Sequence, residues 1–508
     1  MLGSVLTAGL FGIDAFPVEC EADLSNGLPS FDLVGFLSSE VREVRERVRS
    51  ALHNSDISLP PSRLTINLSP ANRRKAGNSF DLPIAVCVLT AAGLLTQKQV
   101  DPYLFSGELG LDGSVKPVNG AISLCACAKA CGRKAVILPA ENAAEGAASQ
   151  TLPVYGVRSL TDVLRFLKDP HLYAPVSPED YPSLPADVPD FSDVIGQPGA
   201  VRAAEIAAAG MHNLLFSGPP GIGKSMIAKR LPGILPPITL SEQIEITKIY
   251  SVRGLTRGGL MTHRPFRSPH HTISPYALAG GGAVPQPGEI SLSHRGVLFL
   301  DELPEFNKSA LEVMRQPMED GEVLISRTSG VYRFPARFML AAAMNPCPCG
   351  YYPDRKRCRC TDADILRYQG RISRPLMDRI DLRVTLSSLN YRSMEEGPHA
   401  EASSVIRERV TAAAERQRAR SGGKPVFNAS LTGQALEEAV ALTPEARSTL
   451  RALYGANPHS MRSHHKLLRI ARTIADLADR QTIGDAELSE AWFLRNTGVP
   501  GNEGGEER

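Results

Sequence analysis

Residues 218–225 have the spacing of a phosphate-binding loop, in which glycines precede a lysine and a serine. Glycine lets backbone N–H groups turn inward on a β-phosphate. The lysine ammonium reaches the β- and γ-phosphate oxygens, and the serine hydroxyl ligates Mg²⁺. The residues are Gly218, Pro219, Pro220, Gly221, Ile222, Gly223, Lys224 and Ser225. This pattern predicts that the chain binds a nucleoside triphosphate together with Mg²⁺.

Two carboxylates, Asp301 and Glu302, directly follow the apolar run 297–300. A buried parallel strand has this composition, and it delivers its last side chains to the edge of the sheet beside the phosphate loop. We expect Asp301 to hold Mg²⁺, directly or through water. We expect Glu302 to polarise the attacking water as a general base.

A second apolar run, 338–344, predicts another buried strand that ends at Asn345. The Asn345 amide can hydrogen-bond the attacking water or the γ-phosphate. Its alternative role is to close a turn before Pro346. Further along lie the arginines Arg371, Arg374 and Arg379. An arginine in this segment either stabilises the transition-state charge on a neighbouring subunit's γ-phosphate or lies on the surface without a role.

Four cysteines within fourteen residues form a second group with metal-binding chemistry: Cys347, Cys349, Cys358 and Cys360. Four thiolates at this spacing could close a tetrahedral Zn²⁺ site. The C-x-C pairs are tighter than the common C-x-x-C knuckle, and the alternative is a loop of reduced, unliganded thiols. The loop also carries Arg355, Lys356, Arg357 and Arg359.

The elements that position these residues belong to a globular protein of 508 residues, enough for about three domains. A net charge of +2 excludes bulk attraction to polyanions, so any contact with nucleic acid must come from local basic patches. No N-terminal segment resembles a signal peptide, and the apolar run 82–95 is too short to span a bilayer. Nine cysteines, without the density of a disulfide scaffold, favour the reducing cytosol. We therefore expect a cytoplasmic protein without a membrane partner.

The order of strand and helix patterns predicts an α/β fold class in separate units. These are an α+β domain (1–167), a proline-rich linker (168–189), a P-loop ATPase domain with a parallel sheet (190–388), a helical domain (389–497) and a disordered tail (498–508).

Two basic segments of the ATPase domain are candidates for contact with DNA phosphates. Asp301 follows Lys224 by 77 positions, which indicates an insertion between them. Within this segment, the glycine-rich stretch 253–271 carries Arg264 and Arg267. Residues 323–334 alternate, turn at 328–330 and alternate back, which predicts a hairpin bearing Arg327 and Arg333. The alternative for both segments is a solvated basic surface.

The order of these motifs resembles the AAA+ ATPases, and more narrowly their magnesium-chelatase-like branch called YifB or ComM. The resemblance covers nearly the whole chain. The phrases that carry it are Asp193–Gln197, Phe266-Arg-Ser-Pro-His-His-Thr272, Gly288-Glu-Ile-Ser-Leu292, Met344-Asn-Pro-Cys-Pro-Cys-Gly350, Pro375-Leu-Met-Asp-Arg379 and Arg469–Leu477. The resemblance implies ATP as the nucleotide, a homo-hexameric ring and a C-terminal helical lid. It also implies that the insertion and the hairpin point into the ring pore.

The same resemblance implies roles for three further residues. Asn345 would be the sensor-1 residue, Arg379 the finger that acts on a neighbouring subunit, and Arg462 the sensor-2 arginine of the lid. Arg374 stands where members of the family more often have glycine, so the finger is either Arg374 or Arg379.

The implied function is branch migration on single-stranded and branched DNA during natural transformation and homologous recombination, with recombination proteins as further partners. Two alternatives belong to other classes. One is a chelatase-type motor that drives Mg²⁺ insertion into a porphyrin. The other is an ATP-gated protein remodeller that does not translocate DNA.

Within the first domain, residues 75–79 and 106–139 resemble the Lon protease domain, in which a serine attacks and a lysine serves as its base. Ser79 falls near the nucleophile position. Leu124, however, stands at the lysine position, and Lys129 is displaced from it by more than one helical turn. We therefore expect a Lon-like fold without proteolysis.

Overall fold

The computed structural model describes residues 2–180, 188–256, 259–387, 398–456 and 460–496. The predicted tail, 498–508, and residues 181–187 of the predicted linker lie outside these residues.

The first domain is built on a mixed seven-stranded sheet of order β3-β4-β2-β1-β5-β8-β9. Its strands are β1 (Leu2–Phe11), β2 (Asp14–Ser25), β3 (Ser30–Val34), β4 (Arg63–Ser69), β5 (Tyr103–Phe105), β8 (Ala135–Pro139) and β9 (Val154–Val157). The principal helices are α2 (Val44–Asn54), α3 (Asp81–Ala91), α5 (Ala121–Ala130), α6 (Ala140–Ala148) and α7 (Leu160–Lys168). Every residue of helix α3 is buried, so this helix has no solvent-exposed face. A short helix, α1 (Ser39–Arg42), precedes α2 and is separated from it by Glu43.

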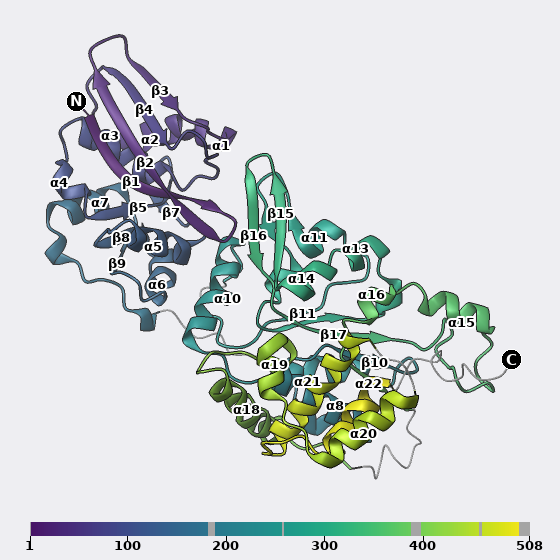
Figure 1. Cartoon of the computed structure of the whole chain (residues 1–508). Helices are drawn as coiled ribbons and strands as arrows, with labels where there is room; N and C mark the ends of the chain where they lie inside the picture. Colours follow the sequence, from purple (N-terminus) through teal and green to yellow (C-terminus); the bar gives the residue numbers. More distant parts are fainter. Residues whose placement is uncertain (1, 181–187, 257–258, 388–397, 457–459, 497–508) are drawn as a thin grey trace.

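The second domain contains a five-stranded sheet of order β11-β14-β17-β10-β18, in which every pairing is parallel (Figure 1). Its strands are β10 (Leu214–Ser217), β11 (Phe266–Arg267), β14 (Val297–Leu300), β17 (Met339–Met344) and β18 (Leu382–Thr385). Helices α8 (Pro198–Gly210) and α9 (Lys224–Ile234) pack against it, and their alanines and leucines share one apolar core with the sheet. Because the strands are parallel, their carboxyl ends all lie at one edge. The strands predicted at 297–300 and 338–344 are confirmed.

The 77 positions from Lys224 to Asp301 hold more structure than one strand–helix–strand step. After α9 come α10 (Leu240–Val252), β11, α11 (Pro275–Ala279), a short hairpin of β12 (Gly280–Gly281) and β13 (Gln286–Pro287), and α12 (Glu289–Leu292). The glycine-rich stretch 253–271 contains the edge strand β11. The predicted hairpin is confirmed: β15 (Glu322–Arg327) pairs with β16 (Gly330–Pro335), and the two strands close at Arg327 opposite Gly330.

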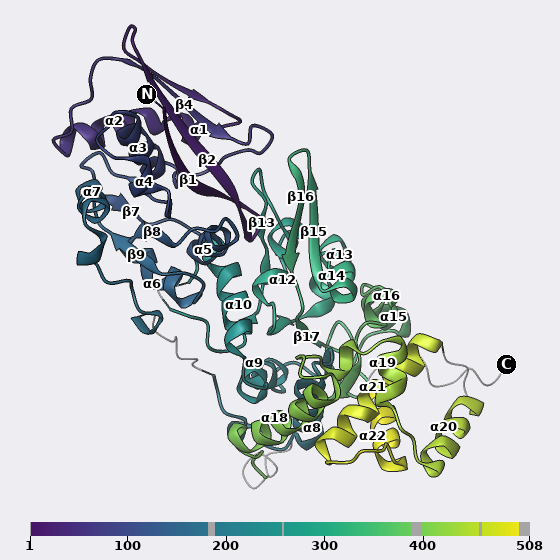
Figure 2. The same ribbon diagram turned by 60° about the vertical axis from the view of Figure 1, so that its left-hand side comes forward.

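The tip of the β1–β2 hairpin joins the first domain to the second. The Phe11 ring stacks on Tyr332 of β16 with ring centroids 4.1 Å apart. Ile13 is buried in the same apolar cluster as Leu215 and Ile325 of the second domain. Ion pairing of Lys248 with Asp14 and hydrogen bonding of Ser251 to Glu145 tie α10 to the first domain. Both ribbon views show α10 and the β15–β16 hairpin beside this domain (Figures 1 and 2).

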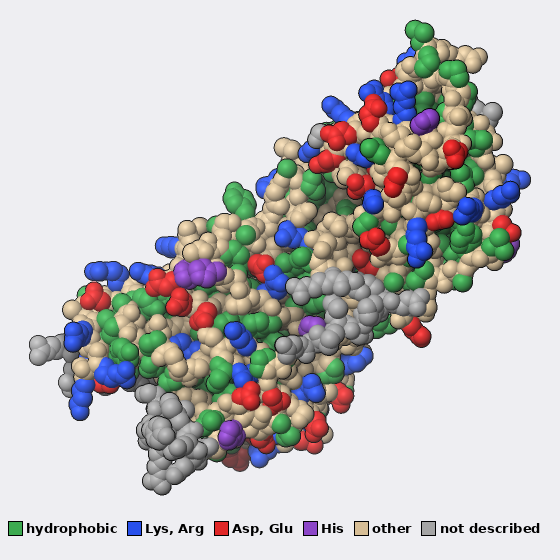
Figure 3. All heavy atoms as spheres, turned by 180° about the vertical axis from the view of Figure 1, so that it is seen from behind, with side chains coloured by type: hydrophobic (Ala, Val, Ile, Leu, Met, Phe, Trp, Pro, Cys, Tyr) green, Lys and Arg blue, Asp and Glu red, His purple; other side chains and the backbone are tan. Residues whose placement is uncertain are grey.

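The surface mixes charges of both signs. On the face shown in Figure 3, Lys and Arg side chains are interspersed with Asp and Glu along the length of the molecule. None of the helices in the described ranges is long and apolar enough to cross a bilayer.

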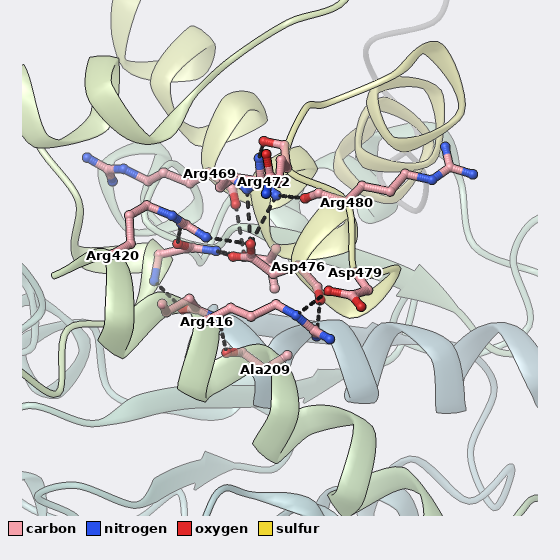
Figure 4. A network of polar contacts seen from close by, with 12 residues as sticks. Ala209, Arg416, Arg420, Arg469, Arg472, Asp476, Asp479 and Arg480 are labelled. Atoms are coloured by element: carbon pink, nitrogen blue, oxygen red, sulfur yellow. Dashed lines mark hydrogen bonds and ion pairs between the residues drawn. The ribbon is translucent and has the colours of Figure 1, made fainter. Parts of the chain in front are cut away.

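The third domain is a set of helices packed against α8 and α9, as Figure 1 shows at the end of the molecule remote from the first domain. It comprises α18 (Ser403–Arg420), α19 (Gly433–Ala439), α20 (Pro444–Ala456), α21 (Met461–Leu477) and α22 (Asp485–Asn496). Apolar residues spaced three and four positions apart on one side of α21 are buried; they are Leu467, Ile470, Ala471 and Ile474. The opposite side of α21 carries a buried carboxylate, Asp476, which accepts hydrogen bonds from Arg420, Asn428 and Arg472 (Figure 4).

Candidate nucleotide site

The phosphate-binding loop runs from the end of β10 to the start of α9. Gly221 and Gly223 adopt left-handed backbone conformations, with φ of 75° and 97°, which L side chains rarely adopt. Helix α9 begins at Lys224. Its first N–H groups therefore have no partner within the helix, and they face the loop as an anion site.

Lys224 lies inside this loop, with only 8% of its surface exposed. Its Nζ donates to the Gly218 carbonyl at 2.6 Å, to the Pro219 carbonyl at 2.8 Å and to Asn345 Oδ1 at 3.0 Å. Burial lowers the pKa of Lys224 to about 8, although Asp301 and Glu302 oppose the shift. The structure thus brings together the lysine and the asparagine that were predicted from separate motifs.

Asp301 follows β14, and its Oδ2 accepts a hydrogen bond of 2.6 Å from Ser225 Oγ. These two oxygens are the predicted Mg²⁺ ligands, and hard oxygen donors suit that ion. Their proximity to Lys224 fits a triphosphate with its metal, because the lysine and the metal would neutralise the same phosphate oxygens.

Glu302 adopts a left-handed conformation, with φ of 53°, and its side chain is 57% exposed. Its Oε2 lies 3.5 Å from Nδ1 of His271, on the segment that follows β11. We did not predict this pairing. The available signal was the His-His pair in the phrase that begins at Phe266, because β11 is adjacent to β14 in the sheet.

Arg379 and Arg462 lie at the opposite edge of the sheet. The Arg379 carbonyl accepts from the side chain of Asn213, which precedes β10, whereas the phosphate-binding loop follows β10. The Arg379 guanidinium pairs with Glu319 at 2.5 Å, and Arg462 pairs with the same carboxylate oxygen. Lys466 of α21 also reaches this edge, where it pairs with Asp381 at 2.8 Å. Within one protomer, therefore, neither Arg379 nor Arg462 lies beside Lys224.

The alternative finger, Arg374, lies exposed at the start of α16 (Arg374–Met377). Arg371 is also exposed and pairs with Glu305 at 2.8 Å.

The four arginines predicted to contact DNA differ in accessibility. Arg264 is only 4% exposed, and it donates to the carbonyls of Pro236 and Arg295 at 2.7 and 2.8 Å. Its prediction as a DNA contact is wrong, because its donors are satisfied by backbone carbonyls inside the fold.

Arg267 forms two hydrogen bonds to Glu289, of 2.6 and 2.7 Å, and is half-buried. Arg327 and Arg333 are exposed on the β15–β16 hairpin, and Arg333 pairs with Glu322 at 2.9 Å.

In the first domain, Ser79 is half-buried just before α3, and its carbonyl accepts from the Gly107 N–H at 3.0 Å. Leu124 is buried in α5, at 1% exposure, and Lys129 lies exposed further along that helix. The structure supplies no proton acceptor at Leu124.

The four cysteines predicted to bind zinc converge. The Sγ atoms of Cys347, Cys349, Cys358 and Cys360 all lie within 4.8 Å of one another.

Comparison with known protein families covers the three domains in turn. Family profiles described as "Subunit ChlI of Mg-chelatase", "Magnesium chelatase, subunit ChlI" and "Magnesium chelatase, subunit ChlI C-terminal" match residues 20–142, 190–394 and 400–495.

Full-length relatives decide the assignment. The chain is 41% identical over 503 residues to the competence protein ComM of Haemophilus influenzae, covering 97% of each chain. It is 41% identical over 497 residues to the uncharacterized protein YifB of Escherichia coli, again covering 97% of each. The chain belongs to the YifB/ComM family of magnesium-chelatase-like proteins.

The chain is also similar to an uncharacterized protein of Mycobacterium tuberculosis, with 41% identity over 504 residues, or 98% of this chain and 99% of that protein. A magnesium-chelatase 67 kDa subunit of Chlorobaculum parvum is more distant, at 24% identity over 211 residues, 41% of this chain and 28% of that subunit. Membership in the YifB/ComM family supports an AAA+ motor, in agreement with the parallel sheet, the phosphate-binding loop and the C-terminal helices.

Proposed function

We propose that this chain is an ATP-dependent, homo-hexameric ring motor that acts on single-stranded and branched DNA and drives branch migration in natural transformation and homologous recombination. One observation carries the proposal: the catalytic groups are divided between two edges of the sheet. Lys224 and Asp301 lie at the carboxyl edge, and Arg379 lies at the amino edge. A head-to-tail arrangement of copies would complete each site, and such an arrangement forms a ring when the rotation between neighbouring copies closes.

At the carboxyl edge, the loop N–H groups and Lys224 would hold the β- and γ-phosphates of ATP. Ser225 and Asp301 would hold Mg²⁺, which when bound offsets the negative charge of the phosphates. Glu302 would accept a proton from the attacking water, and Asn345 would orient that water or the γ-phosphate.

Across the subunit boundary, Arg379 would reach the neighbour's γ-phosphate, where charge develops in the transition state. A finger arginine in related phosphoryl-transfer sites accelerates turnover by on the order of 10³ to 10⁵. Arg462 shares Glu319 with Arg379, and we assign it to the same neighbouring site.

The proposed DNA-contacting surface is the β15–β16 hairpin, with exposed Arg327 and Arg333. The name of the Haemophilus influenzae relative, a competence protein, supports a role with DNA. A chelatase-type motor is the second candidate, and it is supported by the match to the Chlorobaculum parvum subunit, which covers only 41% of this chain. An ATP-gated protein remodeller is the third.

Two further assignments complete the proposal. We place the protein in the cytoplasm, because none of the nine cysteines, all of which lie in the described ranges, forms a disulfide. We also include Zn²⁺ among its cofactors, held by the four cysteines of the 347–360 loop.

The decisive experiment measures ATP hydrolysis by the purified full-length chain without DNA, with single-stranded DNA and with a four-way junction. The expected result is stimulation by DNA together with conversion of the junction to duplex products, both abolished by Lys224→Ala. A rate that is the same with every DNA, from protein that has assembled yet binds none of them, would overturn the proposal. Stimulation without junction conversion would restrict the function to DNA binding or translocation.

A further inference from the structure

The loop from Cys347 to Cys360 follows the strand that positions Asn345. It leaves β17 directly after that residue and leads into α15 (Asp362–Gln369), which projects from the side of the ATPase domain (Figure 1).

The sulfurs of this loop surround a common centre. Cys347 Sγ lies 3.4 Å from Cys349 Sγ and 3.7 Å from Cys358 Sγ, and Cys349 Sγ lies 3.5 Å from Cys358 Sγ. A tetrahedral ion with Zn–S bonds of about 2.3 Å places its sulfurs about 3.8 Å apart. A disulfide needs about 2.05 Å. The observed Sγ–Sγ distances are therefore close to those expected around a shared metal ion, and they are too long for disulfide bonds.

The loop has little else to hold it in this conformation. Its apolar cluster contains only three buried residues, Cys347, Cys358 and Ile365, with Tyr351 and Tyr352 packed at the margin. So small a core stabilises a segment weakly, and compact segments of this kind commonly depend on a metal. The Tyr352 N–H also points at Cys347 Sγ, at 3.5 Å, as hydrogen-bond donors do around metal-bound thiolates.

Charge also favours a thiolate-bound ion. Four thiolates and one Zn²⁺ sum to a net charge of −2. The same loop carries four cations, Arg355, Lys356, Arg357 and Arg359. The guanidinium of Arg357 lies 4.0 Å from the Tyr351 ring centroid, which holds this cation beside the cluster. The guanidinium of Arg355 lies 4.9 Å from the Tyr352 ring centroid and donates to the Cys360 carbonyl at 2.9 Å, but it also pairs with Asp362.

The loop also touches the nucleotide site. Gly350 adopts a φ of 85°, and a Cβ at this position would lie 2.6 Å from Pro220 Cδ of the phosphate-binding loop. Gln369 donates to the Pro346 carbonyl at 3.0 Å, which anchors the segment next to Asn345. The cysteine loop thus packs directly on residues that would surround the triphosphate.

We propose that Cys347, Cys349, Cys358 and Cys360 bind one structural Zn²⁺ per protomer, and that this ion holds the loop against Pro220 so that its removal weakens ATP binding. Four protein ligands leave no open position, so the ion would take no part in hydrolysis. Metal binding is argued from the geometry, core and charge of the cysteine loop itself, whereas the effect on ATP rests on the proposed function.

The first measurement is the zinc content of untagged, full-length protein, determined by inductively coupled plasma mass spectrometry. We expect one zinc per chain in the wild type and in Cys131→Ser, a cysteine outside the cluster, and almost none in the double variant Cys349→Ser/Cys360→Ser. Replacement of zinc by Co²⁺ in the wild type should give the visible bands of tetrahedral thiolate coordination. Wild type without zinc and without these bands would overturn the metal site.

The second measurement uses reversible removal, which avoids dependence on the folding of a variant. Zinc is stripped from the wild type by a chelator and then restored, and the binding of a fluorescent ATP analogue is measured at each stage. We expect affinity to fall about tenfold on removal and to recover on restoration. Full zinc occupancy with an unchanged affinity after removal would overturn the coupling, while leaving both the metal site and the ATPase proposal intact.

Discussion

At the residue scale, the two adjacent carboxylates after β14 face different partners. Asp301 accepts from Ser225, whereas Glu302 adopts a left-handed conformation and its carboxylate lies near His271. A non-glycine residue in this conformation costs on the order of 1–3 kcal/mol, which the surrounding fold must supply. The cost is understandable if Glu302 must point at a water molecule rather than at the metal.

Glu302→Gln tests this separation of roles. The amide keeps the size of the side chain but cannot accept a proton, so we expect ATP binding to persist while turnover falls by on the order of 10² to 10⁴. Nucleotide affinity and steady-state hydrolysis are measured together, with Glu437→Gln on the exposed surface of the lid as control. Hydrolysis at the wild-type rate would remove Glu302 from its assigned role.

The lowered pKa of Lys224, about 8, predicts how ATP binding depends on pH. Bound phosphates would raise this pKa again, so the complex keeps the lysine protonated at a pH where the free protein has lost the proton. Below pH 8 the lysine is charged in both states, and affinity is insensitive to this group. Above pH 8, affinity should fall about tenfold per pH unit.

Calorimetry of ATP binding in two buffers of different ionisation enthalpy checks this sign. Proton uptake should be near zero well below the lysine pKa and should approach one proton above it. Equal heats in the two buffers above that pKa would show that Lys224 does not titrate there.

At the scale of elements, the β15–β16 hairpin is fixed at its base and accessible at its tip. Val323 and Phe334 are buried in the core, whereas Arg327 beside the turn is exposed. The aromatic rings nearest the turn, Phe11 and Tyr332, stack on each other. The exposed cations therefore suit contact with the phosphate backbone.

Replacing Arg327 and Arg333 together by alanine should weaken DNA binding and reduce the slope of log affinity against log salt by about 0.7 to 0.9 for each phosphate that the variant no longer binds. Binding of a labelled single strand over a series of salt concentrations gives this slope. Arg45→Ala/Arg165→Ala, two exposed arginines of the first domain, is the matched control. An unchanged slope in the hairpin variant would exclude these residues from binding phosphate.

Element-level expectations succeeded where the pattern was local. The buried strands before Asp301 and Asn345 and the hairpin at 328–330 depend on apolar runs, alternation and turn residues within a few positions. Arg264 shows the opposite case, because the carbonyls that satisfy it belong to Pro236 and Arg295, 28 and 31 residues away. Spacing along the chain likewise did not reveal that His271 meets Glu302, or that Arg379 and Arg462 share Glu319.

At the scale of the whole molecule, the separation of Arg379 from Lys224 predicts that two different defective chains can rescue each other. Lys224→Ala keeps the arginine edge, and Arg379→Ala keeps the phosphate-binding edge. If neighbours in a ring assort at random, about a quarter of the interfaces in an equal mixture combine two intact edges. We expect ATP hydrolysis to recover to about this fraction of the wild-type rate.

The control mixes Lys224→Ala with the double variant Lys224→Ala/Arg379→Ala, in which no interface has an intact phosphate-binding edge. If Arg462 serves the same neighbouring site, Arg462→Ala should be rescued by Lys224→Ala in the same way. No recovery, in mixtures shown by differential labelling to exchange subunits, would mean that each chain works on its own nucleotide.

The burial of Ile13 among residues of the ATPase domain has a practical consequence for dissecting this protein. Only 7% of the Ile13 surface is exposed, and the neighbouring Phe11 covers Tyr332. A shortened polypeptide that begins near Asp190 would expose to water the apolar surface of the ATPase domain that Ile13 and Phe11 cover. It would also remove the contact of Phe11 with Tyr332 of the β15–β16 hairpin. Loss of activity in such a truncation would therefore indicate a destabilised ATPase domain rather than the loss of a separate function of the first domain.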